Sequence, residues 1–377
     1  MGSVPAKRLE NGPLRKLGMS GKAFHPLNGA WAGTAFMGLW YNTGVGRELG
    51  SLARHRAYLG RPPKKGRVEP FPCHPQDVFA KQVAGLAGRL RAIRCRDVVL
   101  GLSGGLDSAL ALLVCAAAFD RLKLDRRGIH VYTMPGFGTS RRTKGNAGQL
   151  AEGLGVRLET ISIVPACRRH FRDIGHDGRT PDVTFENAQA RMRTLILMDK
   201  ANMVDGIIVG TGDMSEIALG WCTYNGDHMS MFGVNSGVPK TIVRKVCAWW
   251  AENARRRGGA ALAAEALRDI IATPVSPELV KGQATERTIG PYELHDFFLW
   301  NFIVNEMGSK DLRAAALRHF GGAYSAEEVD RTLKTFMRRF FTQAFKRNCA
   351  PDGVRVFPFD LSPHGWWIPS DLGPVKI

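Results

Sequence analysis

A serine- and glycine-rich segment carries the clearest chemical signal in the sequence. It occupies positions 101–108, and its residues are Gly101, Leu102, Ser103, Gly104, Gly105, Leu106, Asp107 and Ser108. The paired glycines let the backbone turn tightly and approach phosphate oxygens without an intervening Cβ. The serine hydroxyls and the free N–H groups of a helix start can donate to those oxygens, and the helix dipole favours their negative charge. The segment therefore predicts a phosphate-binding loop.

Asp107 adds a second property to this loop. A carboxylate is poorly placed against bare phosphate, but hard cations such as Mg²⁺ bind carboxylates together with phosphate oxygens. We therefore predict that Asp107 is a Mg²⁺ ligand. The segment lacks the Gly-Lys-Ser/Thr ending of a Walker A motif, so a different kind of nucleotide loop is expected.

Five later motifs combine polar, charged and aromatic residues. They occupy positions 134–144 (MPGFGTSRRTK), 186–193 (ENAQARMR), 210–216 (GTGDMSE), 221–229 (WCTYNGDHM) and 237–241 (GVPKT). Plainer interpretations exist for each of them. Glu216 could be a first-turn helix acid that interacts with the dipole. Arg193 could belong to a solvated helix face, and Trp221 and Tyr224 could be core aromatics.

The elements that must position these motifs are short apolar runs alternating with helical patterns. The predicted strands are 97–102, 128–134, 157–163 and 206–210, and the predicted helices are 107–119, 143–154 and 184–203. This alternation implies right-handed βαβ units and a parallel sheet covered on both faces. Ligands of such sheets bind at the carboxyl ends of the strands, where the motifs fall. We predict an α/β fold with a doubly wound parallel sheet, preceded by a helix over residues 75–93 and followed from Lys240 by a helical C-terminal extension.

Composition narrows the class of protein further. The chain has 377 residues, a formal net charge of +18 and seven scattered cysteines without a CxxC pair. Residues 1–70 hold 12 Lys and Arg against three Asp and Glu, which favours anionic partners. No interleaved aromatic pattern indicates stacking on bases, so no specific nucleic-acid partner is expected. No apolar run reaches the length of a membrane span, and the N-terminus lacks a signal-peptide core. We expect a cytoplasmic protein with reduced thiols.

Taken in order, the motifs resemble the synthetase domain of bacterial glutamine-dependent NAD⁺ synthetases, which belong to the N-type ATP pyrophosphatase superfamily. The resemblance runs from about Arg67 to the C-terminus and includes late pieces at 276–279 (SPEL), 290–291 (GP) and 345–347 (FKR). It implies a basic extension of unknown fold at 1–66 and a synthetase domain at 67–377 with the adenine nucleotide alpha hydrolase-like sheet. The activity it implies is a carbon–nitrogen ligase. ATP adenylates the carboxylate of deamido-NAD⁺, and ammonia replaces AMP to give NAD⁺, with AMP and pyrophosphate released.

The resemblance also implies a role for individual positions. Residues 101–108 would hold the ATP phosphates, with Thr211, Lys240 and Thr273 also on the ATP side. Asp107 and Glu216 would bind Mg²⁺ and, together with Lys240, form the catalytic set. The residues that would contact deamido-NAD⁺ are Asn187, Arg193, Trp221, Cys222, Thr223, Tyr224 and Lys346. In this family the dinucleotide site lies at a homodimer interface, so a homodimer is expected.

One part of the family pattern is not found in the sequence. Glutamine-dependent members carry an N-terminal nitrilase-like glutaminase domain with a Glu-Lys-Cys triad, and residues 1–66 do not resemble it. Cys73, the only cysteine before the helix predicted at 75–93, reads as a linker residue. We therefore expect ammonia as the nitrogen donor of this chain, either free or supplied by a separate glutaminase subunit. The chain could also be a fragment of a longer gene product.

Two other functions compete with this prediction. The first is a pyrophosphatase-loop enzyme that modifies tRNA, which the basic charge would suit. Such enzymes usually need paired cysteines for sulfur transfer, and no such pair is evident in the sequence. The second is a catalytically inactive nucleotide-binding protein, against which the intact Ser103, Asp107, Ser108 and Glu216 argue.

Overall fold

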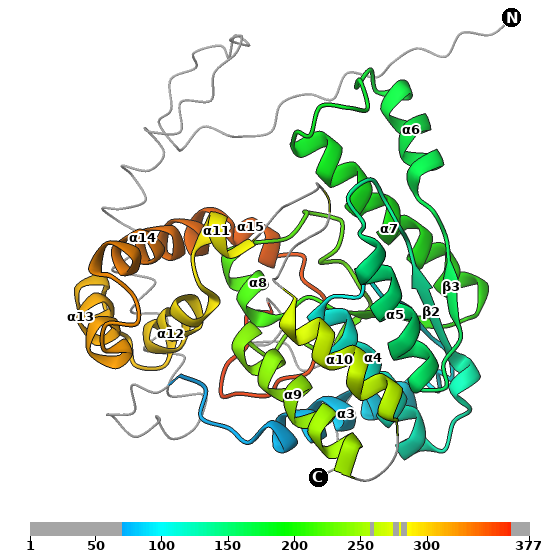
Figure 1. The fold of residues 1–377 in the computed structure, drawn as a ribbon, viewed down its shortest axis with the longest axis horizontal. Coiled ribbons are helices and arrows are strands. Elements are labelled where there is room, and N and C mark those ends of the chain that lie inside the picture. The colour runs from blue at the N-terminus through cyan, green and yellow to red at the C-terminus, as the bar shows by residue number, and fades with distance from the viewer. Residues whose placement is uncertain (1–69, 257–259, 274–278, 280–284, 363–377) are drawn as a thin grey trace, which may run out of the picture. The chain divides into compact units, whose positions relative to one another are not determined.

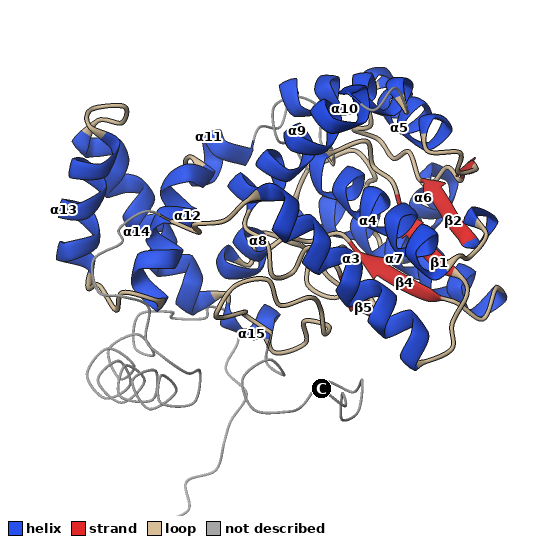
Figure 2. Cartoon of the chain, turned by 90° about the horizontal axis from the view of Figure 1, so that it is seen from below, coloured by secondary structure: helices blue, strands red, loops and turns tan. Residues whose placement is uncertain are grey.

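A five-stranded parallel sheet organises the protein in the computed structural model, which describes residues 70–256, 260–273, 279 and 285–362. The strand order is β3-β2-β1-β4-β5, and the sheet is shown in red in Figure 2. Its strands are β1 (Val98–Gly101), β2 (Ile129–Thr133), β3 (Leu158–Thr160), β4 (Ile207–Gly210) and β5 (Phe232–Gly233). All four pairings are parallel, with Val98 beside Ile129 on one side and beside Ile207 on the other. The predicted α/β fold is confirmed.

The two faces of the sheet are covered by different helices, as alternating side chains require. Val98 and Leu100 belong to a large apolar cluster with residues of α3, α4, α5, α9 and α10, whereas Val99 belongs to a second cluster with residues of α6 and α7. The bounds are α3 (Pro75–Ala92), α4 (Leu106–Leu122), α5 (Arg141–Gly153), α6 (Val164–Asp173), α7 (Val183–Met203), α9 (Lys240–Arg256) and α10 (Ala261–Ala272). Figure 1 shows α6 and α7 together at one side of the molecule.

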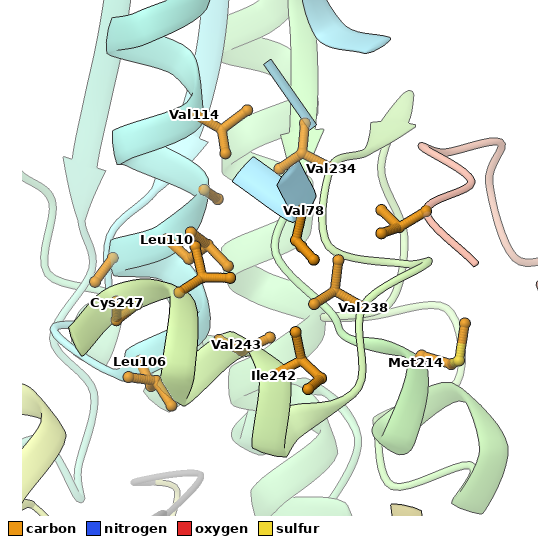
Figure 3. Close-up of a cluster of buried hydrophobic side chains, with 14 of the residues drawn as sticks. Val78, Leu106, Leu110, Val114, Met214, Val234, Val238, Ile242, Val243 and Cys247 are labelled. Carbon is orange, nitrogen blue, oxygen red and sulfur yellow. The ribbon is translucent and has the colours of Figure 1, made fainter. Parts of the chain in front are cut away.

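An apolar cluster that includes Leu106, the loop residue at which α4 begins, joins segments from distant parts of the sequence. Figure 3 shows Leu106 and Leu110 of α4 beside Val243 and Cys247 of α9, with Val78 of α3 close by. Each of these side chains is less than 9% exposed. Close packing of this kind fixes the start of α4 relative to α9, and these two helices carry residues of the predicted site.

The C-terminal part is helical, as predicted. Its helices are α11 (Thr285–Ile289), α12 (Tyr292–Ile303), α13 (Ser309–Phe320), α14 (Ala326–Thr342) and α15 (Ala344–Arg347). Helix α12 is buried along most of its length and contacts α8 (Met214–Leu219), α9, α13 and α14. Figure 1 shows α12, α13 and α14 grouped away from the sheet. In the described ranges, none of the helices is both long enough and apolar enough to cross a bilayer.

Most predicted elements match the structure to within a few residues. The sequence patterns did not predict α6, α8 or β5, which are short, and a 3-10 turn at Arg126–Gly128 was also missed. The predicted basic extension at 1–66 lies outside the described residues.

Candidate active site

The sequence-predicted residues come together in one large pocket at the carboxyl ends of β1, β2 and β4. Its volume is about 660 Å³. The predicted residues that line it are Gly101, Leu102, Ser103, Gly104, Gly105, Leu106, Asp107, Ser108, Asn187, Arg193, Thr211, Glu216, Trp221, Cys222, Thr223, Tyr224, Thr273 and Lys346. Lys240 lies behind the wall, with 2% of the residue exposed, and contacts the pocket-lining Asp107 and Glu216.

The phosphate loop is held in place by its own side chains. Ser103 Oγ lies 3.0 Å from Ser108 Oγ and accepts from the Gly105 N–H at 3.1 Å, and the Ser108 hydroxyl donates to the Gly105 carbonyl at 3.1 Å. Gly104 has a φ of 86°, and a Cβ there would lie 2.2 Å from the Thr143 carbonyl oxygen. Position 104 therefore requires glycine both for its backbone conformation and for the close approach of α5.

A buried ion cluster forms one end of the pocket. Lys240 Nζ lies 2.6 Å from Asp107 Oδ2, 2.8 Å from Asp213 Oδ2 and 2.9 Å from Glu216 Oε1. The Asp213 side chain is fully buried, and the Glu216 side chain is 22% exposed. Three acidic side chains thus share one ammonium at the pocket wall.

Burial and mutual repulsion shift the ionisation of this cluster. Burial raises the pKa of Asp213 well above its usual value and raises the pKa of Glu216 to about 7, although Lys240 opposes both shifts. Burial alone would lower the pKa of Lys240, but attraction to the three carboxylates outweighs it and raises that pKa well above its usual value. The ammonium is therefore fully charged at neutral pH.

The donor set of the cluster fits a divalent cation. Asp107, Asp213 and Glu216 each offer a carboxylate oxygen, and these ligand atoms lie within 4.8 Å of one another. Asp107 Oδ1 is buried and has no hydrogen-bond partner among the residues that the structure describes. Carboxylate oxygens are the ligands that Mg²⁺ takes in proteins, so these residues fit the predicted metal.

Asp213 was not among the predicted site residues, although it stands inside the motif at 210–216. Its Oδ1 accepts from the Glu216 N–H at 2.8 Å, and Glu216 Oε2 lies 3.5 Å from the Asp213 nitrogen, which completes a capping box at the start of α8. The plainer interpretation of Glu216 as a first-turn helix acid is thus also correct. The same capping geometry turns both carboxylates toward Lys240.

Two buried side chains outside the predicted motifs hold the cluster in position. Asn235 Nδ2 donates to the Asp107 carbonyl at 2.9 Å and to the Thr211 carbonyl at 3.0 Å, and Gln82 Nε2 donates to Asn235 Oδ1 at 2.9 Å. One amide therefore connects the phosphate loop to the end of β4. This role depends on contacts across more than a hundred residues of sequence, and no local pattern indicated it.

The second side chain is Asp296 of α12. Its Oδ2 accepts from the Thr241 N–H at 3.0 Å and the Thr241 hydroxyl at 2.7 Å, and its Oδ1 accepts from the Ser215 hydroxyl. Ser215 Oγ in turn accepts from the Lys240 N–H at 2.8 Å. Burial raises the pKa of Asp296 to about 6, against the effect of these hydrogen bonds. The C-terminal helices thereby fix the start of α9, from which the Lys240 side chain extends.

The opposite end of the pocket is built from α7, the 221–224 segment and α15. Asn187 Oδ1 accepts from the Thr223 hydroxyl at 2.9 Å, while Arg193 Nε donates to the Met134 carbonyl at 3.0 Å. The two side chains therefore diverge around α7, as their spacing predicts, yet both line the pocket. Lys346 Nζ donates to the Cys222 carbonyl at 2.6 Å and to the Gly220 carbonyl at 2.9 Å.

Aromatic groups surround this end. Tyr224 is 42% exposed, and its ring centroid lies 5.4 Å from that of Phe345, which is 50% exposed. The Arg339 guanidinium lies over the Trp221 ring at 4.9 Å. The predicted dinucleotide contacts are thus partly exposed side chains, in contrast to the buried ion cluster.

These features define an α/β domain with a glycine-rich loop and a cluster of three carboxyl groups at the ends of its parallel strands. The NAD synthase family profile matches residues 78–335. The chain therefore belongs to the NAD synthase family.

The relatives found by sequence support this assignment. The chain is 38% identical over 347 residues to the glutamine-dependent NAD(+) synthetase of Mycobacterium leprae, covering 81% of this chain and 50% of that protein. It is 34% identical over 241 residues to the enzyme of the same name from Rhodobacter capsulatus, covering 63% and 42%. The chain thus spans about half the length of the curated relatives it matches, or less.

Solved structures show the same fold. A glutamine-dependent NAD(+) synthetase from Cytophaga hutchinsonii aligns with a TM-score of 0.63 at 19% identity, covering 78% of this chain and 53% of that one. The NMN synthetase of Francisella tularensis aligns with a TM-score of 0.55 at 22% identity, covering 72% and 96%.

Proposed function

We propose that this chain catalyses the ATP-dependent amidation of deamido-NAD⁺ to NAD⁺, with release of AMP and pyrophosphate. The observation that carries the proposal is the single pocket with a phosphate loop and carboxylate cluster at one end and Asn187, Arg193 and exposed aromatics at the other. A pocket of about 660 Å³ can receive a nucleotide and the reacting part of a second one. Membership of the NAD synthase family supports this reaction over tRNA modification.

The reaction needs an activated carboxylate. A carboxylate is a poor acyl electrophile, and adenylation gives it AMP as a leaving group. In this step the deamido-NAD⁺ carboxylate oxygen attacks the α-phosphorus, and the bond to the β-phosphate oxygen breaks. Negative charge develops on the departing pyrophosphate, which the N–H groups of the 101–108 loop and the Lys240 ammonium can stabilise.

Asp107 and Glu216 would hold Mg²⁺, with Asp213 behind them. When bound, Mg²⁺ supplies positive charge to the phosphate oxygens and orients them. Lys240 at present neutralises part of the carboxylate charge, with its Nζ within 3 Å of all three groups. We propose that it shares these carboxylates with the metal and that its positive charge stabilises the departing pyrophosphate through space. Thr211 and Thr273 line the ATP side of the pocket.

The second step forms the amide. Ammonia attacks the carbonyl carbon of the adenylate, AMP leaves, and the nitrogen loses a proton. Asp227 lines the pocket, and its Oδ1 accepts from the Thr223 N–H at 2.6 Å. Asp227 is exposed, so its carboxylate is open to the attacking nitrogen and can accept a proton from it. We favour it over Asp213, which is fully buried and pairs with Lys240.

We propose ammonia as the molecule that reaches the adenylate, either from solution or from a glutaminase active elsewhere. We also propose a homodimer, because α7 exposes apolar side chains: Val183 is 67%, Leu195 55% and Met203 73% exposed. The division into a basic extension at 1–66 and a synthetase domain at 67–377 remains our interpretation.

The direct test incubates the purified chain with ATP, Mg²⁺, ammonium and deamido-NAD⁺. We expect NAD⁺, AMP and pyrophosphate in equal amounts, with a rate that rises toward alkaline pH as more ammonium becomes ammonia. Replacing ammonium by glutamine tests the nitrogen source, and glutamate formed in step with NAD⁺ would refute direct use of ammonia. Absence of any AMP formation that depends on deamido-NAD⁺ would refute the proposed reaction.

A further inference from the structure

A histidine and a cysteine from distant parts of the sequence meet beside the pocket. His228 Nε2 lies 3.3 Å from Cys349 Sγ, although the two residues are 121 positions apart in the sequence. His228 lines the large pocket, and Cys349 follows α15, whose Lys346 lines the same pocket. Cys349 is partly exposed and is not in a disulfide. The proposed reaction uses neither side chain.

The other ring nitrogen of His228 fixes the direction in which a proton can move. His228 Nδ1 lies 2.9 Å from the Thr223 carbonyl oxygen. A carbonyl oxygen only accepts, so Nδ1 carries the hydrogen and Nε2 of the neutral ring has the lone pair. Burial lowers the pKa of His228, which favours that neutral ring. Nε2 is therefore a base that faces a thiol.

A small cavity lies next to this pair. Its volume is about 30 Å³, and its lining includes His228, Ser230, Arg347 and Ala350. This is about the share of volume that one water molecule takes in the liquid. Ser230 is 8% exposed, and within the described part of the chain its Oγ has no hydrogen-bond partner. A buried hydroxyl without a partner costs about 1–3 kcal/mol, which one small polar molecule in this otherwise largely apolar cavity would offset.

We infer that Cys349 is a modification site: its thiol reacts preferentially with small electrophiles, such as hydrogen peroxide, with His228 as the proton acceptor. His228 Nε2 takes the thiol proton, and the sulfur electron pair forms a bond to one peroxide oxygen as the O–O bond breaks. The sulfur is oxidised to a sulfenic acid, and the peroxide is reduced. The departing hydroxide takes the proton from the imidazolium and leaves as water.

Modification of Cys349 should disturb the end of the pocket at which we propose that the dinucleotide binds. The Lys346 carbonyl oxygen lies 3.4 Å from Cys349 Sγ and is the other acceptor within reach of its one proton, and His228 Nδ1 donates to the Thr223 carbonyl. An added oxygen or acetamide group does not fit between sulfur and Nε2 at 3.3 Å, so the pair must separate. This second part rests on the proposed function. It predicts that modification weakens deamido-NAD⁺ binding and leaves ATP binding unchanged.

Competitive labelling tests the thiol without reference to activity. The protein is treated with limiting iodoacetamide, or with hydrogen peroxide and dimedone, and each cysteine peptide is quantified by mass spectrometry. Cys73 and Cys95, which are also partly exposed, serve as internal controls. We expect Cys349 to react about tenfold faster than either. In His228→Gln, the labelling rate of Cys349 should fall to that of the control cysteines. The labelling rate of Cys95 should stay unchanged, which shows that the fold is intact. Equal rates for the three cysteines in the unaltered protein would overturn the proposal.

Cys349→Ser tests the link to the pocket. Peroxide should reduce NAD⁺ formation by the unaltered protein, with recovery after dithiothreitol, and should leave the serine variant active. The loss should appear as a raised KM for deamido-NAD⁺ and an unchanged KM for ATP. Fast labelling of Cys349 without any change in turnover would refute the link between its modification and deamido-NAD⁺ binding. An untreated protein that forms no NAD⁺ would instead refute the proposed function, and the labelling result would still decide the status of the thiol.

Discussion

The two ends of the pocket are built in opposite ways. At the phosphate end, the charges of Asp107, Asp213 and Lys240 contact one another, and Lys240 is only 2% exposed. At the other end, Tyr224 and Phe345 are about half exposed. The first end is fixed before any ligand binds, as catalysis on phosphates requires. The second has side chains that can adjust to the dinucleotide.

The supporting contacts follow the same division. Asn235 and Asp296 hold the backbone of the phosphate end through buried side-chain hydrogen bonds. At the dinucleotide end, Arg191 and Lys346 donate to backbone carbonyls of the 221–224 segment, which carries predicted contacts, and Arg193 donates to the Met134 carbonyl after β2. Substitutions at the two ends should therefore affect different quantities: turnover and metal use at one, and dinucleotide KM at the other.

The largest effect is expected for Asp107→Asn. The substitution keeps the shape of the side chain but removes one negative charge that faces Lys240 and one proposed Mg²⁺ ligand. AMP formation should fall by about 10³-fold or more, as is typical when a transition-state contact is lost. Circular dichroism should show an unchanged fold. Turnover close to that of the unaltered protein would exclude Asp107 from the mechanism.

Asn235→Ala should have the next largest effect. It leaves the Asp107 and Thr211 carbonyls without the amide that connects them, at a cost of about 1–3 kcal/mol. We expect kcat to fall by about tenfold and the Mg²⁺ requirement to rise, with an unchanged KM for deamido-NAD⁺. Gln82→Ala is the matched control, because it removes the contact to Asn235 Oδ1 and keeps the amide itself. Gln82→Ala should lower kcat less than Asn235→Ala does. A loss of deamido-NAD⁺ affinity in Asn235→Ala as large as its loss of kcat would contradict the division between the two ends of the pocket.

At the dinucleotide end, Arg193→Ala should raise the KM for deamido-NAD⁺ by about tenfold, because a charged hydrogen bond is worth roughly 1.5–3 kcal/mol. The KM for ATP should change little. Asp199→Ala on the same helix removes an exposed charge outside the pocket lining and should leave both constants unchanged. An equal rise in both KM values for Arg193→Ala would show that the two ends are not independent.

The sequence predicted the sheet because its strands are short apolar runs between strong helical patterns. It also predicted the residues of the phosphate loop and of the motif at 210–216, since their chemistry is local. Asp296 could not be predicted, because its hydrogen bonds to Thr241 span 55 residues. Helix α8 was missed because six residues carry too little periodicity, although the Asp213–Glu216 capping pair was visible in the sequence. The patterns thus indicate the groups that line the pocket better than the groups that hold those groups in position.

The smallest expected effect is a pH dependence of stability that Mg²⁺ removes. Burial raises the pKa of Glu216 in the folded chain to about 7, from an ordinary value of 4.5. Between these values the folded state binds more protons than the unfolded state, so stability falls as pH rises through the folded pKa. From pH 6 to pH 8, the ionisation of Glu216 alone should lower the free energy of unfolding by about 1 kcal/mol, or the melting temperature by about 2 °C.

Mg²⁺ binds the ionised carboxylates, so it should raise the melting temperature at pH 8 and have little effect at pH 6. Differential scanning fluorimetry measures both. Glu216→Gln should flatten the pH dependence and the Mg²⁺ effect together, whereas Asp311→Asn, on the exposed surface of α13, should alter neither. If Mg²⁺ stabilises the unaltered protein equally at both pH values, the ion binds elsewhere, and the buried end of the pocket is not the metal site.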